Sequence, residues 1–251
     1  MPTNVAGYDL TTACEIGLCL ALWDPAAAGP VATKLVQRHQ TVSEYSEPRS
    51  QNWQNQRQGT LIARLTCARA RAGEPAPFTE YADWLASTTP ESIGSYLVES
   101  LAPLMEFPTN AAIQALAGRL FGDTNSAWSH LPWKGVGSAN PIETDLIKLS
   151  AFRQLLAREL DVKTVCGSLA WRGPETISFQ LTNSANMNGS RSLKLPEAER
   201  PAEGSKLELR WCDWIAFSLA QASQLPPFNP FVPLEQRDRR AREAKDLLLK
   251  H

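Results

Sequence analysis

The sequence predicts a mainly helical protein in which pairs of helices stack as in a solenoid, closed at the C-terminal end by a small β-hairpin and two helices. Apolar residues recur at steps of three and four through the first 160 residues, which is helical spacing. Beyond residue 160 the apolar period becomes two, which is typical of strands. A side chain that can cap a helix precedes proline at three places: Asp24-Pro25, Thr89-Pro90 and Asn140-Pro141.

Composition places the chain among folded proteins of ordinary charge. It has 251 residues, of which 43% are hydrophobic, with 25 Lys and Arg against 26 Asp and Glu. A near-neutral chain of this kind is not typical of proteins that coat DNA or RNA. The first residues show no secretory signal, and no apolar stretch reaches the roughly 18 residues that a membrane helix needs. We therefore expect a soluble, cytoplasmic protein with no membrane partner.

The first 160 residues are expected to form a stack of helices. The spacing of apolar residues predicts helices over residues 10–23, 25–40, 61–73, 78–85, 93–104, 112–121 and 142–160, with polar or Trp-rich loops over 41–56 and 123–139. Successive helices group into antiparallel pairs over 10–40, 57–87 and 90–121. A helix pair exposes an apolar face that a neighbouring pair can cover, and this is the physical basis of a solenoid. Residues 1–160 are thus interpreted as a helical-repeat-like stack.

Residues 161–251 are expected to form a cap that continues the same domain. Alternating apolar residues on both sides of a Gly-Pro turn predict a hairpin of strands 165–171 and 177–181. Residues 183–191 are polar and are interpreted as a loop, whereas residues 207–211 are interpreted as extended. Asp213 is placed as the N-cap of a helix over 214–221, a role favoured over that of a catalytic acid.

The last helix is predicted over residues 234–250, after a Pro-rich link over 226–231 that cannot be helical. Its basic residues alternate with acidic ones. Glu235 with Arg239, and Asp238 with Arg242, stand four residues apart and are expected to pair along the helix. This pattern predicts a surface helix stabilised by its own ion pairs.

An ordered set of packing and capping residues between about 150 and 250 carries a resemblance. The set is Ala151-Phe152-Arg153, Leu155-Leu156, Arg158-Glu159-Leu160, Lys163-Thr164-Val165, Cys212-Asp213-Trp214, Ala216, Pro227-Phe228, Pro233 and Arg237-Asp238. It resembles the tail of bacterial HEAT-like repeat proteins. The resemblance implies an α-solenoid of the HEAT or armadillo type that serves as an interaction surface, and it brings no catalytic residue.

Metal and nucleophile chemistry are disfavoured by the distribution of their residues. The three histidines are far apart, and the five cysteines are scattered among apolar residues without a metal-ligand spacing. Neither a metal nor another cofactor is expected. Cys212 and Asp213 with His130 form a conceivable trio, but chance supplies such a trio in most chains of this size. The sequence therefore favours a protein without catalytic residues.

Aromatic residues in loops are the candidates for binding a protein partner. Trp128 and Trp133 lie in the loop over 123–139, and Phe228 and Phe231 lie in the Pro-rich link. Such residues either pack over helix ends or anchor a partner, since tryptophan is enriched in binding hot spots. The predicted function is that of a scaffold or adaptor that binds another protein through a helical-repeat surface.

The alternative prediction is a helical-repeat protein that binds or processes nucleic acid. Arg57, Arg64 and Arg71 recur every seven residues, with Arg69 close by, and together form a basic stripe on the third helix. A stripe of this kind attracts phosphates, although a solvated helix face explains it as well.

Overall fold

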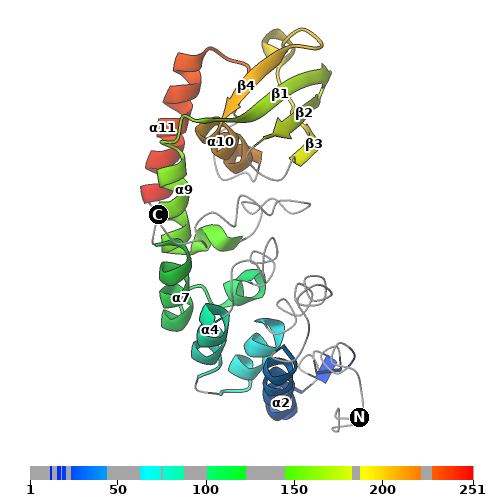
Figure 1. Cartoon of the computed structure of the whole chain (residues 1–251), viewed down its shortest axis with the longest axis vertical. Helices are drawn as coiled ribbons and strands as arrows, with labels where there is room; N and C mark the ends of the chain where they lie inside the picture. Colours follow the sequence, from blue (N-terminus) through cyan, green and yellow to red (C-terminus); the bar gives the residue numbers. More distant parts are fainter. Residues whose placement is uncertain are drawn as a thin grey trace. The chain divides into compact units, whose positions relative to one another are not determined.

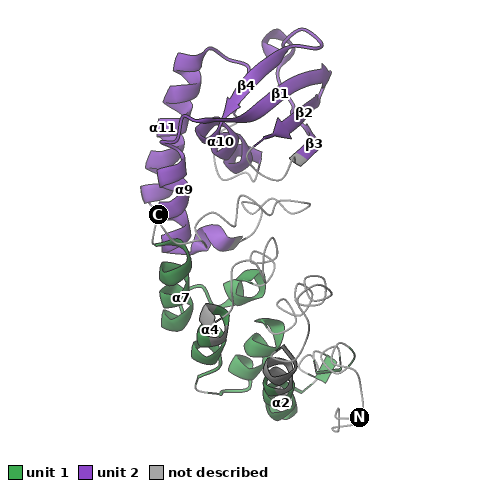
Figure 2. Ribbon diagram, in the orientation of Figure 1, with its two compact units in different colours: residues 1–132 green, residues 133–251 purple. Residues whose placement is uncertain are grey.

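The computed structural model describes the chain in two compact units, which are residues 1–132 and 133–251 (Figures 1 and 2). The described residues are 12, 16–17, 19–20, 24–43, 63–74, 76–87, 101–122, 145–182, 187–221 and 228–250. Within them, no helix has the length and apolar character needed to cross a bilayer. Most of the predicted helices over 10–23 and 93–104, most of the predicted loop over 41–56 and the whole loop over 123–139 lie outside the described residues. Residues 41–43 of the predicted loop are helical instead.

The first unit is built from helices close to those that the apolar spacing predicts. They are α2 (Pro25–Ser43), a helix over residues 63–71, α4 (Pro77–Ser87), the short 3-10 helix η2 (Ala102–Glu106) and α7 (Ala111–Phe121). Two starts are capped by side chains. Asp24 accepts from the amide of Ala27 at 3.2 Å, and Asn110 accepts from that of Ala112 at 2.9 Å. The buried faces supply apolar residues of the core, which include Leu35, Leu65, Leu85, Leu104, Leu116 and Phe121.

The second unit contains a four-stranded antiparallel sheet, and the predicted fold class is therefore wrong. Its strands are β1 (Val165–Gly173), β2 (Thr176–Leu181), β3 (Met187–Ser192) and β4 (Lys206–Arg210), in the order β3-β2-β1-β4. The chain is mainly helical, but a solenoid-like stack closed by a small hairpin does not describe a unit with this sheet. The predicted hairpin is confirmed as β1 and β2, and it is extended on both sides by β3 and β4.

Strand β3 occupies a segment that the sequence presented as a loop. The strand reads Met-Asn-Gly-Ser-Arg-Ser and has no alternating apolar pattern. Its register pairs Met187 with Leu181, Gly189 with Phe179 and Arg191 with Ile177, so the positions opposite buried residues of β2 carry a methionine, a glycine and an arginine. A strand with a single apolar residue among its inner positions gives no period-two signal.

The described helices of the second unit are η4 (Asp145–Lys148), α9 (Ser150–Glu159), the short 3-10 helix η5 (Glu197–Glu199), α10 (Trp211–Gln221) and α11 (Leu234–Lys250). The last helix is confirmed. The single helix predicted over 142–160 is wrong, because the described part is a 3-10 turn and then an α-helix, separated at Leu149. Arg153 stabilises the break, since its Nη1 donates to the carbonyl oxygens of Ile147 at 2.9 Å and Lys148 at 3.1 Å.

Helix α10 begins at Trp211, two residues before the predicted cap Asp213. The first amides of the helix donate to the chain that leads into β1: Trp211 to the carbonyl of Thr164 at 3.1 Å and Cys212 to that of Val162 at 3.0 Å. Backbone carbonyls thus satisfy two of the orphan donors of the helix start, and the amide of Arg210 donates to Asp213 Oδ2 at 3.4 Å. Asp213 lies within the first turn, and its carboxylate forms ion pairs with Arg210 and Arg237.

One face of the sheet is buried against helices, and α10 lies against it in Figure 1. The rings of Phe179 on β2 and Trp214 on α10 are 5.0 Å apart between centroids, and Trp214 in turn contacts Phe217 at 6.0 Å. The opposite face carries small and polar side chains that are exposed or half-buried, among them Ser168, Ser178, Gln180, Asn188 and Ser190. The second unit is therefore a sheet with one packed face and one open face.

Candidate functional site

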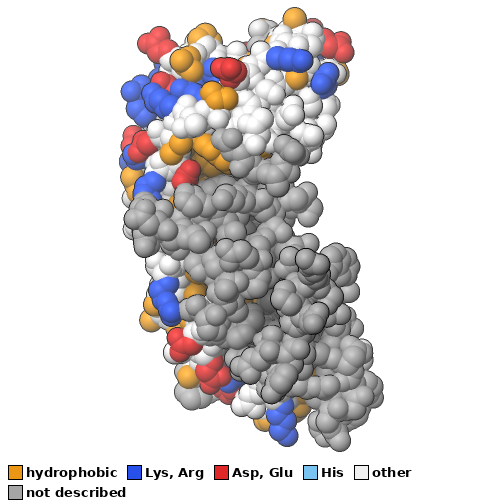
Figure 3. Space-filling model, in the orientation of Figure 1, with side chains coloured by type: hydrophobic (Ala, Val, Ile, Leu, Met, Phe, Trp, Pro, Cys, Tyr) orange, Lys and Arg blue, Asp and Glu red, His pale blue; other side chains and the backbone are white. Residues whose placement is uncertain are grey.

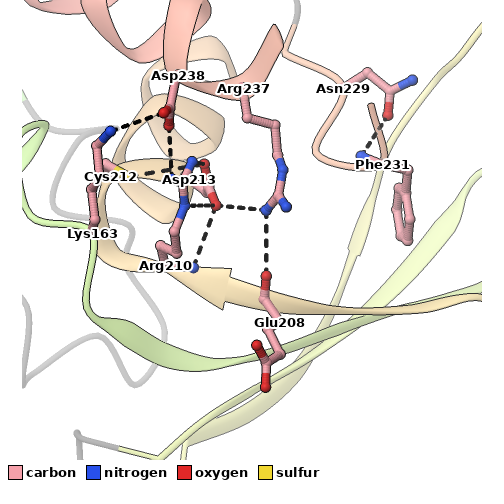
Figure 4. Close-up of polar contacts among 9 residues, drawn as sticks. All are labelled: Lys163, Glu208, Arg210, Cys212, Asp213, Asn229, Phe231, Arg237 and Asp238. Atoms are coloured by element: carbon pink, nitrogen blue, oxygen red, sulfur yellow. Dashed lines mark hydrogen bonds and ion pairs between the residues drawn. The ribbon is translucent and has the colours of Figure 1, made fainter. Parts of the chain in front are cut away.

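A cluster of five charged side chains joins β4, α10 and α11. At its centre is Asp213, which is 0% exposed. Arg210 holds this carboxylate with two bonds, Nη2 to Oδ1 at 2.8 Å and Nε to Oδ2 at 2.9 Å, and Arg237 adds a third from Nη1 to Oδ2 at 2.7 Å (Figure 4). Two-bond contacts of this kind are the strongest geometry for an arginine and a carboxylate.

The cluster continues outward through Asp238 on α11. Its carboxylate contacts Arg210 Nη1 at 2.7 Å and Lys163 Nζ at 2.8 Å (Figure 4). The bonds from Lys163 and then Arg210 hold the pKa of Asp238 below its ordinary value, and the hydrogen bond with Asp213 raises the pKa of Arg210. The predicted helix pair of Asp238 with Arg242 is thus replaced by long-range contacts that fasten α11 to the sheet.

The carboxylate of Asp213 has the geometry of a structural anchor. Both of its oxygens are taken by guanidinium groups, and no part of it is exposed to a substrate. Cys212 lies beside it, with Sγ at 3.9 Å from Oδ1. His130, the third residue of the conceivable catalytic trio, lies outside the described residues.

The buried thiols are poorly suited to nucleophilic chemistry. Burial raises the pKa of Cys67 and of Cys166 to about 12, and burial also raises the pKa of Cys212. The thiolate is the reactive form, so these side chains stay protonated near neutral pH. Cys19, in contrast, is exposed. Among the described residues, no three His, Cys, Asp or Glu side chains stand together as metal ligands would.

The arginine stripe of the first unit contains a member that faces the core. Arg69 is 3% exposed; its Nε contacts Glu74 at 2.7 Å and its Nη2 contacts Glu80 at 2.7 Å. Thr33 on α2 donates to the same Glu74 carboxylate at 3.0 Å. This arginine therefore joins three helices of the first unit to one another.

The other arginines of the stripe differ in surroundings. Arg64 is exposed, Arg71 forms an ion pair with Glu106, and Arg57 lies outside the described residues. Acidic partners thus compensate two of the three described arginines. The second unit likewise shows basic and acidic side chains interspersed on the face in Figure 3, and on α11 Arg240 pairs with Glu243 at 2.8 Å.

Of the four aromatic candidates for partner binding, two pack within the second unit and two lie outside the described residues. Phe228 is buried at 4% exposure. Phe231 is half-buried and meets Trp171 edge to face, with ring centroids 6.0 Å apart. Its amide donates to Asn229 Oδ1 at 2.9 Å, which fixes the turn before α11 (Figure 4). Trp128 and Trp133 lie outside the described residues.

The β3 edge, defined as the outward backbone groups of Asn188, Ser190 and Ser192, is an open hydrogen-bonding edge of the sheet. Leu193 donates to the carbonyl of Glu175 at 2.9 Å, and this bond continues the β2–β3 register without a shift. Hydrogen-bonded pairs alternate along an antiparallel ladder, so the odd-numbered residues of β3 bond to β2. The amides and carbonyls of the three even-numbered residues therefore point away from β2.

The two edges of the sheet differ in how they are covered. On β4, the carbonyl of Glu208 accepts from Arg237 Nη1 at 3.4 Å, and the amide of Arg210 donates to Asp213 at 3.4 Å. On β3, all three residues of the edge are exposed, and within the described part of the chain no group bonds to their outward amides and carbonyls. Open edges of this kind are templates for pairing with another chain.

Sequence reasoning missed this edge because it depends on recognising β3. The one available signal was position: a Gly-containing polar segment follows β2 after a short connection, as the second strand of a hairpin does. Comparison with known proteins adds no further constraint, since no family model, no curated protein and no solved structure matches the chain.

Proposed function

We propose that the protein binds a protein partner, and that an extended segment of the partner adds to the sheet at the β3 edge. The observation that carries the proposal is the row of outward backbone groups on Asn188, Ser190 and Ser192. A strand that pairs there satisfies both its own backbone groups and those of β3. The scaffold or adaptor function expected from the sequence is retained, but the proposed surface is a sheet edge.

Several features of the second unit suit such a strand. Pairing with β2 already holds β3 extended, so this side of the interface is ordered before binding. The five-charge cluster ties α10 and α11 to β4 at the other edge of the sheet. The supporting scaffold is thus fastened at one edge, while at the other edge none of the described residues bonds to the outward backbone groups of β3.

A protein partner is favoured over nucleic acid by the charges of the described residues. Affinity for a phosphate backbone requires uncompensated basic side chains. Arg69 and Arg71 instead form ion pairs with glutamates. The basic side chains of α11 alternate with acidic ones, and Arg240 pairs with Glu243. Backbone pairing at a sheet edge requires no such excess of positive charge.

The proposal is tested by placing a photo-reactive amino acid at Ser190 in the full chain and irradiating it in cells. We expect a covalent adduct with a single protein at this position and no adduct when the same group replaces Glu203, an exposed residue of the same unit. Equal adducts at both positions, or none at Ser190, would contradict the proposal.

A further inference from the structure

We propose that the β3 edge selects a partner strand that carries an acidic residue and an aromatic residue two positions apart. This inference rests on the proposed function and names the chemistry of the partner. It follows from Gly189 and Arg191, two of the three residues of β3 that the register pairs with buried residues of β2. Each of them would stand directly opposite a side chain of the added strand.

Gly189 lies directly against the edge of an aromatic ring of the neighbouring strand. A Cβ atom at this position would stand 2.5 Å from Cζ of Phe179, so the ring extends beneath the glycine. The residue opposite Gly189 in an added strand forms a non-hydrogen-bonded pair, in which side chains approach most closely. An aromatic side chain there covers the glycine and contacts the ring of Phe179, as aromatic residues opposite strand glycines do.

Arg191 determines the charge of the next position. Its guanidinium carbon lies 5.9 Å from the ring centroid of Phe179 and 5.8 Å from that of Trp214, on the packed side of the sheet. A carboxylate opposite this residue forms an oppositely charged cross-strand pair, whereas a lysine or arginine would be repelled. An inward-pointing charge also protects an edge against unsuitable strands, so the same side chain excludes one class and selects another.

The two requirements fix a sequence pattern. In an antiparallel strand, the residue opposite Arg191 comes two positions before the residue opposite Gly189, and alternation places both on the same face. The pattern is therefore an acidic residue, any residue, and an aromatic residue, in that order. The intervening side chain lies opposite Ser190 on the open face, where small polar residues surround it.

The strand β3 of a second copy does not meet these requirements. Two copies of β3 would pair through the backbone groups of their even-numbered residues. In the antiparallel registers that keep the two strands overlapped, Met187, Gly189 or Arg191 of the second copy stands opposite Arg191. None of the three supplies a carboxylate, and the last one opposes two like charges. The chemistry of the edge thus favours a different chain.

The inference is tested by selecting random twelve-residue peptides displayed on phage for binding to the full-length protein, followed by synthesis of the enriched peptide. We expect the enriched peptides to share the acidic and aromatic residues at the stated spacing. Ser190→Pro removes an outward amide without removing a bond to β2, and should weaken binding of the synthetic peptide about tenfold or more. Ser190→Thr keeps the amide and serves as the matched control, with unchanged binding.

A charge exchange separates recognition from a general loss of structure. Arg191→Glu should weaken binding of the acidic peptide about fivefold, and changing the acidic residue of the peptide to lysine should restore binding to this variant. Restoration requires that Arg191→Glu be folded and that the two positions face each other. Absence of restoration would overturn the assignment of the acidic residue.

The other outcomes are equally decisive. Enriched peptides that lack the pattern, or that bind Ser190→Pro as well as wild type, would overturn this inference. So would a dimer in solution that Ser190→Pro dissociates, since the occupant would then be a second copy. An adduct at Ser190 in cells whose partner peptide lacks the pattern would overturn the inference while leaving the proposed function standing.

Discussion

Replacing Asp213 with alanine would leave the guanidinium of Arg237 without a counter-ion in a largely buried site. The side chain of Arg237 is 13% exposed and that of Asp213 is 0% exposed, whereas Arg210 keeps its contact with Asp238. Removing one partner of a buried ion pair costs about 3–5 kcal/mol, chiefly because the remaining charge is uncompensated. We expect a loss near the lower value, ~3 kcal/mol, because only one of the two arginines loses its counter-ion.

Amide hydrogen exchange of peptides from α10 measures this loss in the second unit alone. A destabilisation of about 3 kcal/mol corresponds to exchange roughly 10²-fold faster through opening of the unit. The matched control is Asp161→Ala, which breaks an exposed ion pair with Lys245 and should change stability by about 1 kcal/mol or less. The double variant Asp213→Ala with Arg237→Met should recover part of the loss. Exchange within a few-fold of wild type in Asp213→Ala would refute the assignment of the cluster as an anchor.

A pH series, cysteine alkylation and two glycine substitutions test other parts of the structure. The folded pKa of Asp238 is lowered from 3.8, so its ion pairs stabilise the second unit above that value and lose this effect as the pH falls through the folded pKa. Urea unfolding gives the difference in free energy of unfolding between wild type and Asp238→Asn. This difference should decrease only as the pH falls below 3.8 and through the folded pKa of Asp238. A difference that stays constant with pH would contradict this. Iodoacetamide at neutral pH should modify exposed Cys19 while Cys67, with its pKa raised to about 12, reacts only after denaturation, as mass spectrometry of the peptides would show. Gly167→Ala places a Cβ 2.0 Å from a backbone oxygen of β2 and should lower the free energy of unfolding by about 1–3 kcal/mol. At Gly118 in α7 a Cβ meets nothing within 4 Å, so Gly118→Ala should raise the free energy of unfolding by about 0.5–1 kcal/mol. Urea unfolding measures both changes.

Elements whose buried positions carry apolar residues could be predicted from the sequence. Helix α11 buries Ala241, Ala244 and Leu248 at helical spacing, and β2 buries Ile177 and Leu181 at strand spacing. The pattern and the fold agree there because burial of one face produces the periodicity. Strand β3 escaped prediction for the same reason, since only one of its three inner positions, Met187, carries an apolar residue and no alternation results.

The break at Leu149 escaped prediction because two helix types share its spacing. Leu146, Leu149 and Phe152 are all buried and stand three residues apart. A step of three suits one turn of a 3-10 helix as well as one face of an α-helix, so the apolar pattern continues across the change. Hydrogen bonds from Arg153 to the preceding carbonyls reveal the break, and spacing alone does not.

The charged cluster shows what local spacing cannot supply. The residues of α11 were expected to pair at steps of four, and Asp238 pairs instead with Lys163 and Arg210, which are distant in sequence. Such contacts depend on how the sheet and helices pack. The β3 edge is likewise a property of tertiary structure, because an edge exists only once the order of the strands is known.

The most direct test of strand addition at the β3 edge is residue-resolved hydrogen exchange of β3 with and without the selected peptide. The register predicts that the amides of Asn188, Ser190 and Ser192 become protected on binding, because these three point away from β2. The amides of Gly189 and Arg191, which already bond to β2, should change little. Protection that is uniform along the strand, or absent at the three outward amides, would contradict the account.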